Sequence, residues 1–240
     1  MSTKIKQRKP PSEIKESPEL KRKGLTAAVE LAMSHFREGM SEAQKSYILQ
    51  REAKILAETG KVQDAVDVIS HAINFNHVVI FFQMRATFHK TLMKWQEAYF
   101  DYSFAIRLEA ENGSHYAQRG ACLAKLKYLD MALEDLILAC ELEPIAQNFL
   151  TRATIYADLG DYENALEDLD IALEKDDSTN FELKLICSYR RAVVYYELAK
   201  YKDCVDDLQY VLQKDPNSVP PRILLGRAYK MLGGMLCDTR

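Results

Sequence analysis

The chain has 240 residues, of which 48% are hydrophobic and 28% charged, and its formal net charge is -3. This balance is typical of a folded chain and excludes a collagen-like repeat, a disulfide miniprotein and a wholly disordered polypeptide. Apolar runs such as Val78 to Phe82 are far shorter than the roughly 18 residues that a membrane helix needs. We therefore expect no membrane insertion.

The N-terminal segment differs in charge from the rest. Residues 1–23 contain eight Lys and Arg against three Glu, whereas the remainder contains 24 against 32 and is acidic. Residues 1–19 lack the apolar stretch of a signal peptide, so we expect a cytoplasmic protein. Their basic, proline-containing composition predicts a disordered tail. The run Lys21 to Lys23 has the composition of a weak nuclear-import signal or of a solvated linker, which leaves nuclear access open. Nucleic acid is not an expected partner, because the acidic part lacks clustered basic residues.

The chain contains no recognisable motif for catalysis, metal binding or nucleotide binding. Its histidines form no H-E-x-x-H motif, and it has neither a G-x-G-x-x-G nor a G-x-x-x-x-G-K-[ST] loop. Its five cysteines are widely spaced without a C-x-x-C pair, which indicates reduced thiols in the core. We expect no catalytic residues, no cofactor and no metal site.

Small residues recur along the chain in steps of 33 or 34 residues, with one step of 39. Three registers show the same steps, so the chain contains internal repeats. The three series are Ala53, Ala86, Gly120, Ala153, Ala192 and Gly226; Ala65, Ala98, Ala132, Ala165 and Cys204; and Ala72, Ala105, Ala139, Ala172 and Val211.

Each repeat has the pattern of two helices. After Ala165, apolar residues at Leu166, Leu169 and Leu173 follow the spacing of a buried helix face. Breaks such as Leu159-Gly160-Asp161 fall in the middle and at the end of the repeats, and they are typical of helix stops. We therefore predict antiparallel helix pairs joined by short turns.

The fourth repeat has the fullest motif. It contains Arg152-Ala153-x2-Tyr156, then Gly160-Asp161-Tyr162, then Ala165-x3-Leu169-x2-Ala172. This pattern resembles the tetratricopeptide repeat (TPR), a helix–turn–helix unit of about 34 residues. The resemblance implies an all-α fold in which the repeats form a right-handed superhelical solenoid.

The repeat register predicts the organisation of the chain. Residues 20–45 are expected to form an N-terminal helix that caps the first repeat, followed by a linker. Five repeats are expected at 46–78, 79–112, 113–145, 146–179 and 185–218. Residues 219–240 predict a capping helix, equivalent to half of a sixth repeat, and a short tail; a repeat truncated after its first helix is the alternative.

Local signals refine two helix boundaries. Thr179-x-x-Glu182 has the pattern of a capping box, so the first helix of the fifth repeat is expected to start about one turn early. Pro220-Pro221 are expected to open the terminal helix and Gly233-Gly234 to end it.

The small residues are expected to be structural, because a large side chain at a helix crossing would force the two helices apart. Those assigned this role are Ala53, Ala65, Ala86, Ala98, Gly120, Ala132, Ala153, Ala165, Ala192 and Cys204.

Two charged series repeat with the same period, one on each helix of the pair. They are Arg85, Arg119, Arg152 and Arg191, and Asp101, Asp135, Asp168 and Asp207. We favour pairing between neighbouring helices over capture of an acidic peptide, because the two series are equal in number and rise together.

The TPR resemblance implies that the first helices line a concave groove for a peptide or helix of a partner protein. The groove residues implied by the register are Gln50, Lys54, Gln83, Thr87, Lys90, Gln118, Lys125, Leu150, Thr151, Thr154, Tyr189, Arg190, Val193, Tyr196, Ile223 and Arg227. Because tyrosine and arginine are enriched at binding hot spots, we expect binding near the fifth repeat and the last helix.

These patterns predict a non-catalytic scaffold or adaptor that binds another protein. The positions of the carboxylate clamp found in chaperone-binding relatives hold residues such as Met84, Ser114 and Gln118, which do not form that clamp. A chaperone-associated adaptor without the clamp is one alternative. A self-associating subunit of a larger assembly, with weak homo-association through the terminal helix, is another.

Overall fold

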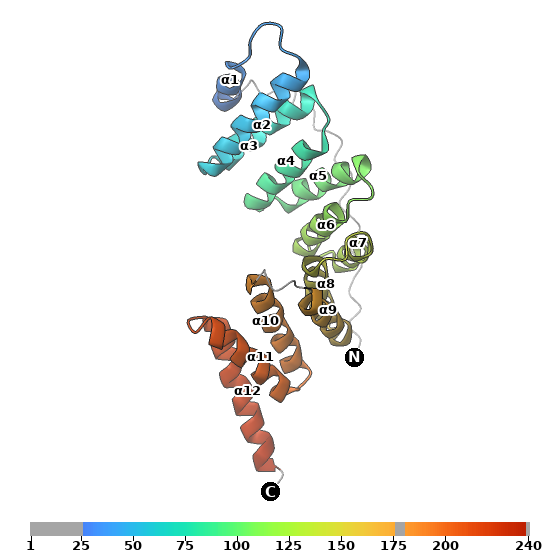
Figure 1. The fold of residues 1–240 in the computed structure, drawn as a ribbon, viewed down its shortest axis with the longest axis vertical. Helices are drawn as coiled ribbons and strands as arrows, with labels where there is room; N and C mark the ends of the chain where they lie inside the picture. The colour runs from blue at the N-terminus through green and yellow to red at the C-terminus, as the bar shows by residue number, and fades with distance from the viewer. Residues whose placement is uncertain (1–25, 176–180, 239–240) are drawn as a thin grey trace. The chain divides into compact units, whose positions relative to one another are not determined.

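The computed structural model describes residues 26–175 and 181–238 (Figure 1). The chain divides into two compact units, residues 1–128 and 129–240. Within the described ranges every regular element is an α-helix. The first unit contains α1 (Ala27–Met33), α2 (Glu42–Glu58), α3 (Val62–Phe75), α4 (Val79–Thr91), α5 (Trp95–Leu108) and α6 (Gly113–Lys125). The second contains α7 (Leu129–Leu142), α8 (Ala146–Leu159), α9 (Tyr162–Lys175), α10 (Phe181–Glu197), α11 (Tyr201–Lys214) and α12 (Val219–Asp238).

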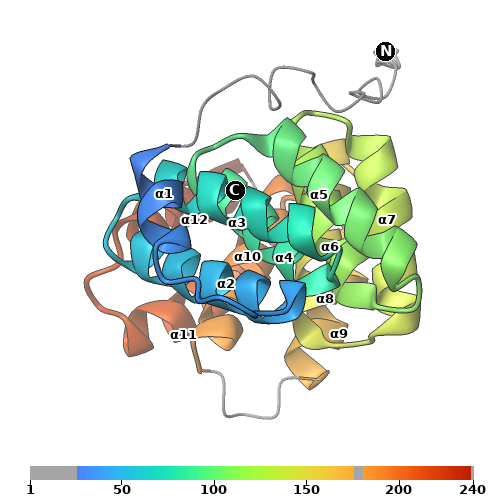
Figure 2. The same ribbon diagram turned by 90° about the horizontal axis from the view of Figure 1, so that it is seen from above.

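Consecutive helices pack as pairs within each unit. In the first unit α2 pairs with α3 and α4 with α5, while α3 packs on α4 and α5 on α6. The short helix α1 lies against α2 and α3 (Figure 2). In the second unit α8 pairs with α9, and α10 pairs with α11. In addition, α7 packs on α8, α9 on α10, and α11 on α12. The predicted all-α repeat fold is thus confirmed, and the third predicted repeat, 113–145, spans the boundary between the units.

Side-chain caps begin the first two helices. The Thr26 hydroxyl accepts a hydrogen bond from the backbone N–H of Val29 at 3.4 Å and starts α1. Ser41 and Gln44 form a reciprocal capping box, with 3.3 and 2.9 Å hydrogen bonds, and start α2 ahead of the predicted position 46. Each cap satisfies backbone donors that the first helical turn leaves free.

The turn inside each of the five repeats contains one residue in the left-handed region, always at the same repeat position. Two of these residues are glycines, Gly60 and Gly160, with φ of 82° and 80°. The other three are Met93, Lys127 and Ala199, with φ of 58°, 67° and 55°. A Cβ atom is disfavoured in this conformation, so these three turns store some strain.

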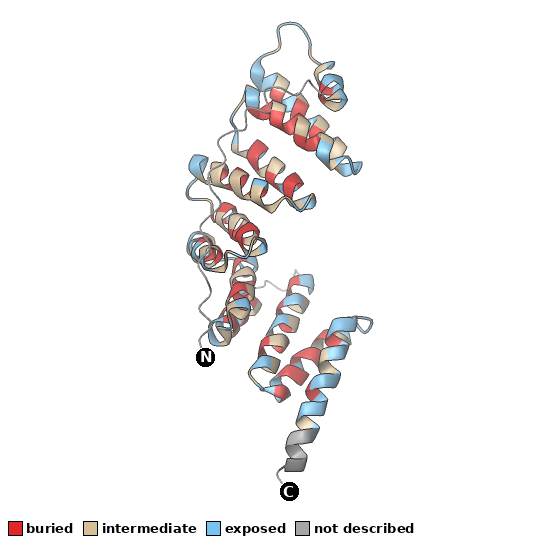
Figure 3. Cartoon of the chain, turned by 180° about the vertical axis from the view of Figure 1, so that it is seen from behind, coloured by how far each residue is buried: buried red, intermediate tan, exposed pale blue. Residues whose placement is uncertain are grey.

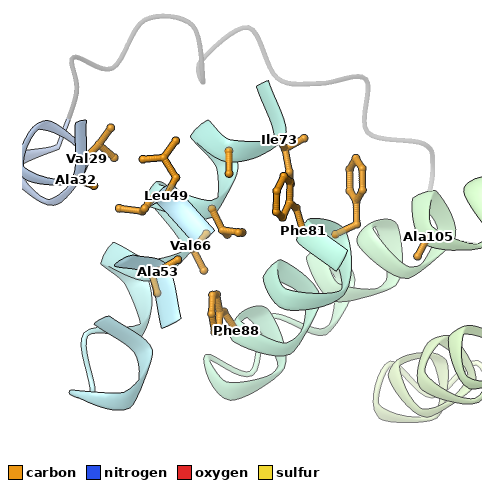
Figure 4. Close-up of a cluster of buried hydrophobic side chains, with 14 residues drawn as sticks. Val29, Ala32, Leu49, Ala53, Val66, Ile73, Phe81, Phe88 and Ala105 are labelled. Carbon is orange, nitrogen blue, oxygen red and sulfur yellow. The ribbon is translucent and has the colours of Figure 1, made fainter. Parts of the chain in front are cut away.

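The helices of a pair bury one face against each other and leave the other exposed (Figure 3). In the first unit, Val29 and Ala32 of α1 join Leu49 of α2 and Phe81 of α4 in one apolar cluster (Figure 4). A second cluster holds α8, α9 and α10 together, and a third holds α10, α11 and α12. The ten small residues assigned a structural role are all buried.

The last helix departs from the sequence prediction. The expectation that Gly233-Gly234 would end it is wrong, because α12 continues to Asp238. Glycine lowers helix propensity by only about 1 kcal/mol per residue, so two glycines do not have to stop a helix. Gly226 is exposed with open space around it, unlike its buried counterparts such as Ala192. The reason is that no second helix packs on this position among the described residues.

Two other boundary predictions meet the limits of the described residues. Thr179, the proposed cap of the fifth repeat, lies outside them; α10 begins at Phe181, about one turn before residue 185, in agreement with the expected early start. The basic tail 1–19 also lies outside them. In the part that is described, no helix is long and apolar enough to cross a bilayer.

Candidate functional site

In the first unit, side chains of the first helices contact one another along one surface. Gln50 of α2 donates through Nε2 to the sulfur of Met84 of α4 at 3.5 Å. On the next helix, the side-chain amide of Gln83 hydrogen-bonds Nε2 of His115 of α6. These contacts join α2 to α4 and α4 to α6.

A third contact extends the same row. Lys90 of α4 donates through Nζ to Oε1 of Gln118 of α6, and its ammonium lies 6.0 Å from the centre of the Tyr102 ring. Burial raises the pKa of the Tyr102 hydroxyl to about 12, so this ring stays neutral beside the cation. We call the row formed by Gln50, Met84, Gln83, His115, Lys90 and Gln118 the polar row.

The remaining predicted residues of the first unit are exposed. Lys54 is exposed, and Thr87 is exposed with its hydroxyl bonded to the carbonyl oxygen of Gln83 at 2.9 Å. Lys125 lies over the Trp95 ring, 5.9 Å from its centre. These cations are open to solvent and free to meet a ligand.

In the second unit, the space between α8 and α10 forms a pocket of about 240 Å³. Three predicted groove residues, Thr154, Arg190 and Val193, line it. Ala153 and Leu169 form buried parts of the wall, and Asp158 and Glu197 contribute carboxylates. We call this space the α8–α10 pocket.

Other predicted residues of the second unit have different environments. Leu150 is buried in the second cluster, so its side chain contributes packing. The Thr151 hydroxyl donates a hydrogen bond to the carbonyl oxygen of Gln147 at 2.8 Å. Tyr189 and Tyr196 are half-buried against the third cluster. Ile223 and Arg227 are exposed on α12.

The charged series pair as structural contacts. The guanidinium groups of Arg85, Arg152 and Arg191 each donate through Nε and Nη2 to the carboxylate sixteen residues later, at 2.6 to 3.1 Å. The acceptors are Asp101, Asp168 and Asp207. Of the fourth predicted pair, Arg119 belongs to the first unit and Asp135 to the second.

The same arginines also reach back to the preceding helix pair. Nη1 of Arg85 donates to Ser70 at 3.2 Å, and Nη1 of Arg191 donates to Asp170 at 2.6 Å. Arg119 makes the equivalent contact with Ser103 at 3.4 Å. Since these donors are already engaged, the arginines fix the register of adjacent repeats.

The buried titratable groups show no sign of a reactive site. Burial raises the pKa of Cys122, Cys140 and Cys204 to about 11, so these free thiols are protonated and unreactive. Burial, with the nearby Arg85 and Lys94, lowers the pKa of His89 to about 4. Among the described residues, no group of three or more His, Cys, Asp or Glu could hold a metal ion.

Sequence reasoning missed several residues of both surfaces. Asp158 and Glu197 occupy the repeat position of Lys125, which was assigned to the groove, so applying that register to α8 and α10 would have found both. Met84 occupies the repeat position of Gln118 and Arg190, so the same register would have found it as well. His115 carried no such signal, because a buried histidine looks like a core residue.

Comparison with known proteins supports the architecture. No protein-family model matches the chain, and no curated protein matches its sequence. YrrB, a TPR protein described as having an unusual peptide-binding site, is 17% identical, with a TM-score of 0.61 over 86% of this chain and 100% of YrrB. A TPR protein of Parabacteroides merdae is 18% identical, with a TM-score of 0.68 over 78% of this chain and 73% of its own.

A TPR protein of Thermus thermophilus is also 18% identical, with a TM-score of 0.59 over 77% of this chain and 98% of its own. The chain has the fold of TPR proteins. The structure thereby supports the resemblance drawn from the motif of the fourth repeat, in which Arg152 and Tyr156 of α8 precede the turn at Gly160.

Proposed function

We propose that the chain is a non-catalytic scaffold that binds a peptide or helix of a partner protein along the first helices of its repeats. The observation that carries this proposal is the polar row, in which side chains of α2, α4 and α6 share one surface. The α8–α10 pocket, between two other first helices, adds a hollow of the kind that accepts a side chain. YrrB, which has the same fold, is described as having a peptide-binding site.

The thiols of Cys122, Cys140 and Cys204 are buried, and burial raises their pKa to about 11, so they are protonated at neutral pH. Free cysteines of this kind suit a cytosolic protein, where we place the function.

Affinity capture from cells with the full chain tests this function. We expect Lys54→Glu/Lys125→Glu in the first unit, or Arg227→Glu on α12 in the second, to lose partners that the wild type retains. All three side chains are exposed, so the changes should leave the fold intact. Lys202→Glu, an exposed lysine of α11, is the matched control for Arg227→Glu. Equal capture by every variant would contradict the proposal.

Self-association through α12 is the second candidate, because Val219, Ile223 and Met231 are exposed on it. Charge disfavours it, since residues 219–233 contain Arg222, Arg227 and Lys230 and no acidic residue. Two copies of this helix would repel each other, and we expect a monomer by light scattering across a concentration series. A mass that doubles with concentration would favour self-association instead.

A further inference from the structure

The α8–α10 pocket lies at the repeat position where α4 and α6 of the first unit are joined by a side-chain bridge. In the first unit, Lys90 of α4 reaches Gln118 of α6. The same two repeat positions in the second unit hold Ala157 of α8 and Arg190 of α10. Alanine cannot span the gap between the helices, so about 240 Å³ remains open at this place.

The walls of the α8–α10 pocket suit an aliphatic chain. Ala153, Ala157, Leu169 and Val193 supply its apolar surface, from three different helices. Its volume is below the roughly 300 Å³ at which pockets for drug-sized ligands begin. A single side chain of a larger partner is therefore the occupant that fits.

The charges around the pocket select the chemistry of that side chain. Asp158 and Glu197 occupy the same repeat position near the ends of α8 and α10, and in the described part of the chain neither forms an ion pair. Arg190 lies seven residues before Glu197 on α10, about 10 Å along the helix axis. The pocket lining thus carries two carboxylates against one guanidinium, a net charge of -1.

The surrounding unit reinforces this selection. Residues 129–240 contain twelve Lys and Arg against 21 Asp and Glu, a net charge of -9, whereas residues 26–128 contain twelve against eleven. A negative surface of this kind attracts cationic segments and raises their local concentration. The complementary ligand is therefore basic.

We propose that the α8–α10 pocket binds a Lys or Arg side chain of the partner peptide. The aliphatic stem lies along Ala157 and Val193, and the cationic head meets Asp158 and Glu197, which is how long basic side chains divide between apolar and polar surroundings. This assignment rests on the proposed function only in that the side chain belongs to a protein partner.

The test uses the full chain and small probes that each present one side chain. N-acetyl-lysinamide and N-acetyl-argininamide are titrated while the methyl NMR signals of Val193 and Val194 are followed. N-acetyl-norleucinamide, which has the aliphatic stem without the charge, is the comparison probe. We expect the two cationic probes to shift these signals at concentrations about tenfold lower than the neutral one, with the difference shrinking at high salt.

Two variants separate the pocket from general surface attraction. Asp158→Asn/Glu197→Gln should weaken the cationic probes about tenfold and leave the neutral probe unchanged, because it removes only charge. Glu163→Gln/Glu167→Gln makes the same charge change on exposed positions of α9 outside the pocket, and it should have little effect. Ala157→Leu fills the pocket while keeping both carboxylates, so it should abolish binding of all three probes.

Each contrary result overturns the assignment. No methyl shift with the cationic probes, equal affinity for the neutral probe, or undiminished binding to Ala157→Leu would each exclude a pocket for a basic side chain. The two proposals fail separately. Probe binding without any partner lost by the groove variants would contradict the proposed function, whereas partner loss without probe binding would contradict only this assignment.

Discussion

Arg152 of α8 and Asp168 of α9 form a two-pronged contact, with Nε donating to Oδ2 at 2.8 Å and Nη2 to Oδ1 at 2.6 Å. The Asp168 side chain is 3% exposed and that of Arg152 is 17% exposed. The hydrogen bonds to Asp168 raise the pKa of Arg152 further above its ordinary value. Each group is therefore the obligatory partner of the other.

Removing one partner should cost far more than removing both. We expect Asp168→Ala to lower the free energy of unfolding by about 3 kcal/mol, because it leaves a nearly buried guanidinium without its carboxylate. Glu167→Ala, at an exposed neighbouring position, should change it by less than about 0.5 kcal/mol. The double variant Arg152→Met/Asp168→Leu should recover most of the loss in urea denaturation. If the double variant were as unstable as Asp168→Ala, the loss of stability could not be explained by an unpaired guanidinium, and the ion pair itself would stabilise the fold.

Ala165 of α9 belongs to the buried cluster that holds the fourth repeat together. It is fully buried in α9, so Ala165→Phe should overpack the contact with α8 and cost about 1 to 3 kcal/mol. Glu167→Phe adds the same ring at an exposed site of α9 and is the control. If thermal melting of Ala165→Phe matched the wild type, the helix packing described for this repeat would be refuted.

Ala199 tests the strain in the turns. Its φ of 55° lies in the left-handed region, and its side chain is exposed. Replacing it with glycine removes the strain and no packing, so Ala199→Gly should raise stability by about 0.5 to 1 kcal/mol. Ala121→Gly, inside α6, should instead lower it by about 1 kcal/mol. Destabilisation by Ala199→Gly, measured by chemical denaturation, would argue against a strained turn.

His89 makes the stability depend on pH. Its Nε2 lies 3.8 Å from Asp101, its Nδ1 has no partner, and its pKa is lowered from 6.5 to about 4. The unfolded chain therefore binds a proton below pH 6.5 that the folded chain takes up only near pH 4, so protonation favours unfolding in this range. Wild type should lose about 2 to 3 kcal/mol between pH 7 and pH 4.5 from this group.

The matched variant is His89→Tyr, which places the residue found at this repeat position in α8 and α10, Tyr156 and Tyr195. Tyrosine does not titrate in this range, so the variant should lack this loss of stability. The measurement is urea denaturation of both proteins at the two pH values. Equal losses in both would show that the pH dependence arises from other groups, such as Asp101.

Much of the repeat architecture could be predicted because each repeat follows the same register. The small residues at Ala53, Ala86 and Ala153 all lie at buried helix crossings, and the pairing of Arg85 with Asp101 follows the predicted period. The exception is Gly233-Gly234, where a local stop signal did not stop α12. The end of α12 depends on the helix propensities of all its residues together, so the low propensity of two glycines is not enough to stop the helix.

The candidate site was less predictable. A register shows which side of a helix a residue faces, and in the structure Lys90 contacts Gln118 while Gln83 contacts His115. Whether these residues bind a partner stays a prediction. The register did not show that Leu150 is buried, because that depends on how closely its neighbours pack.

The sequence by itself determined the helix pairs, their turns and the charge that distinguishes the second unit, because periodicity and composition are properties of the chain. Only the tertiary structure decided which groove positions are bridged and which are open. Whether the gap between two first helices is closed by Lys90 or left open beside Ala157 depends on the distance between helices and the reach of one side chain. That distance is set by packing across several helices, which no local pattern encodes.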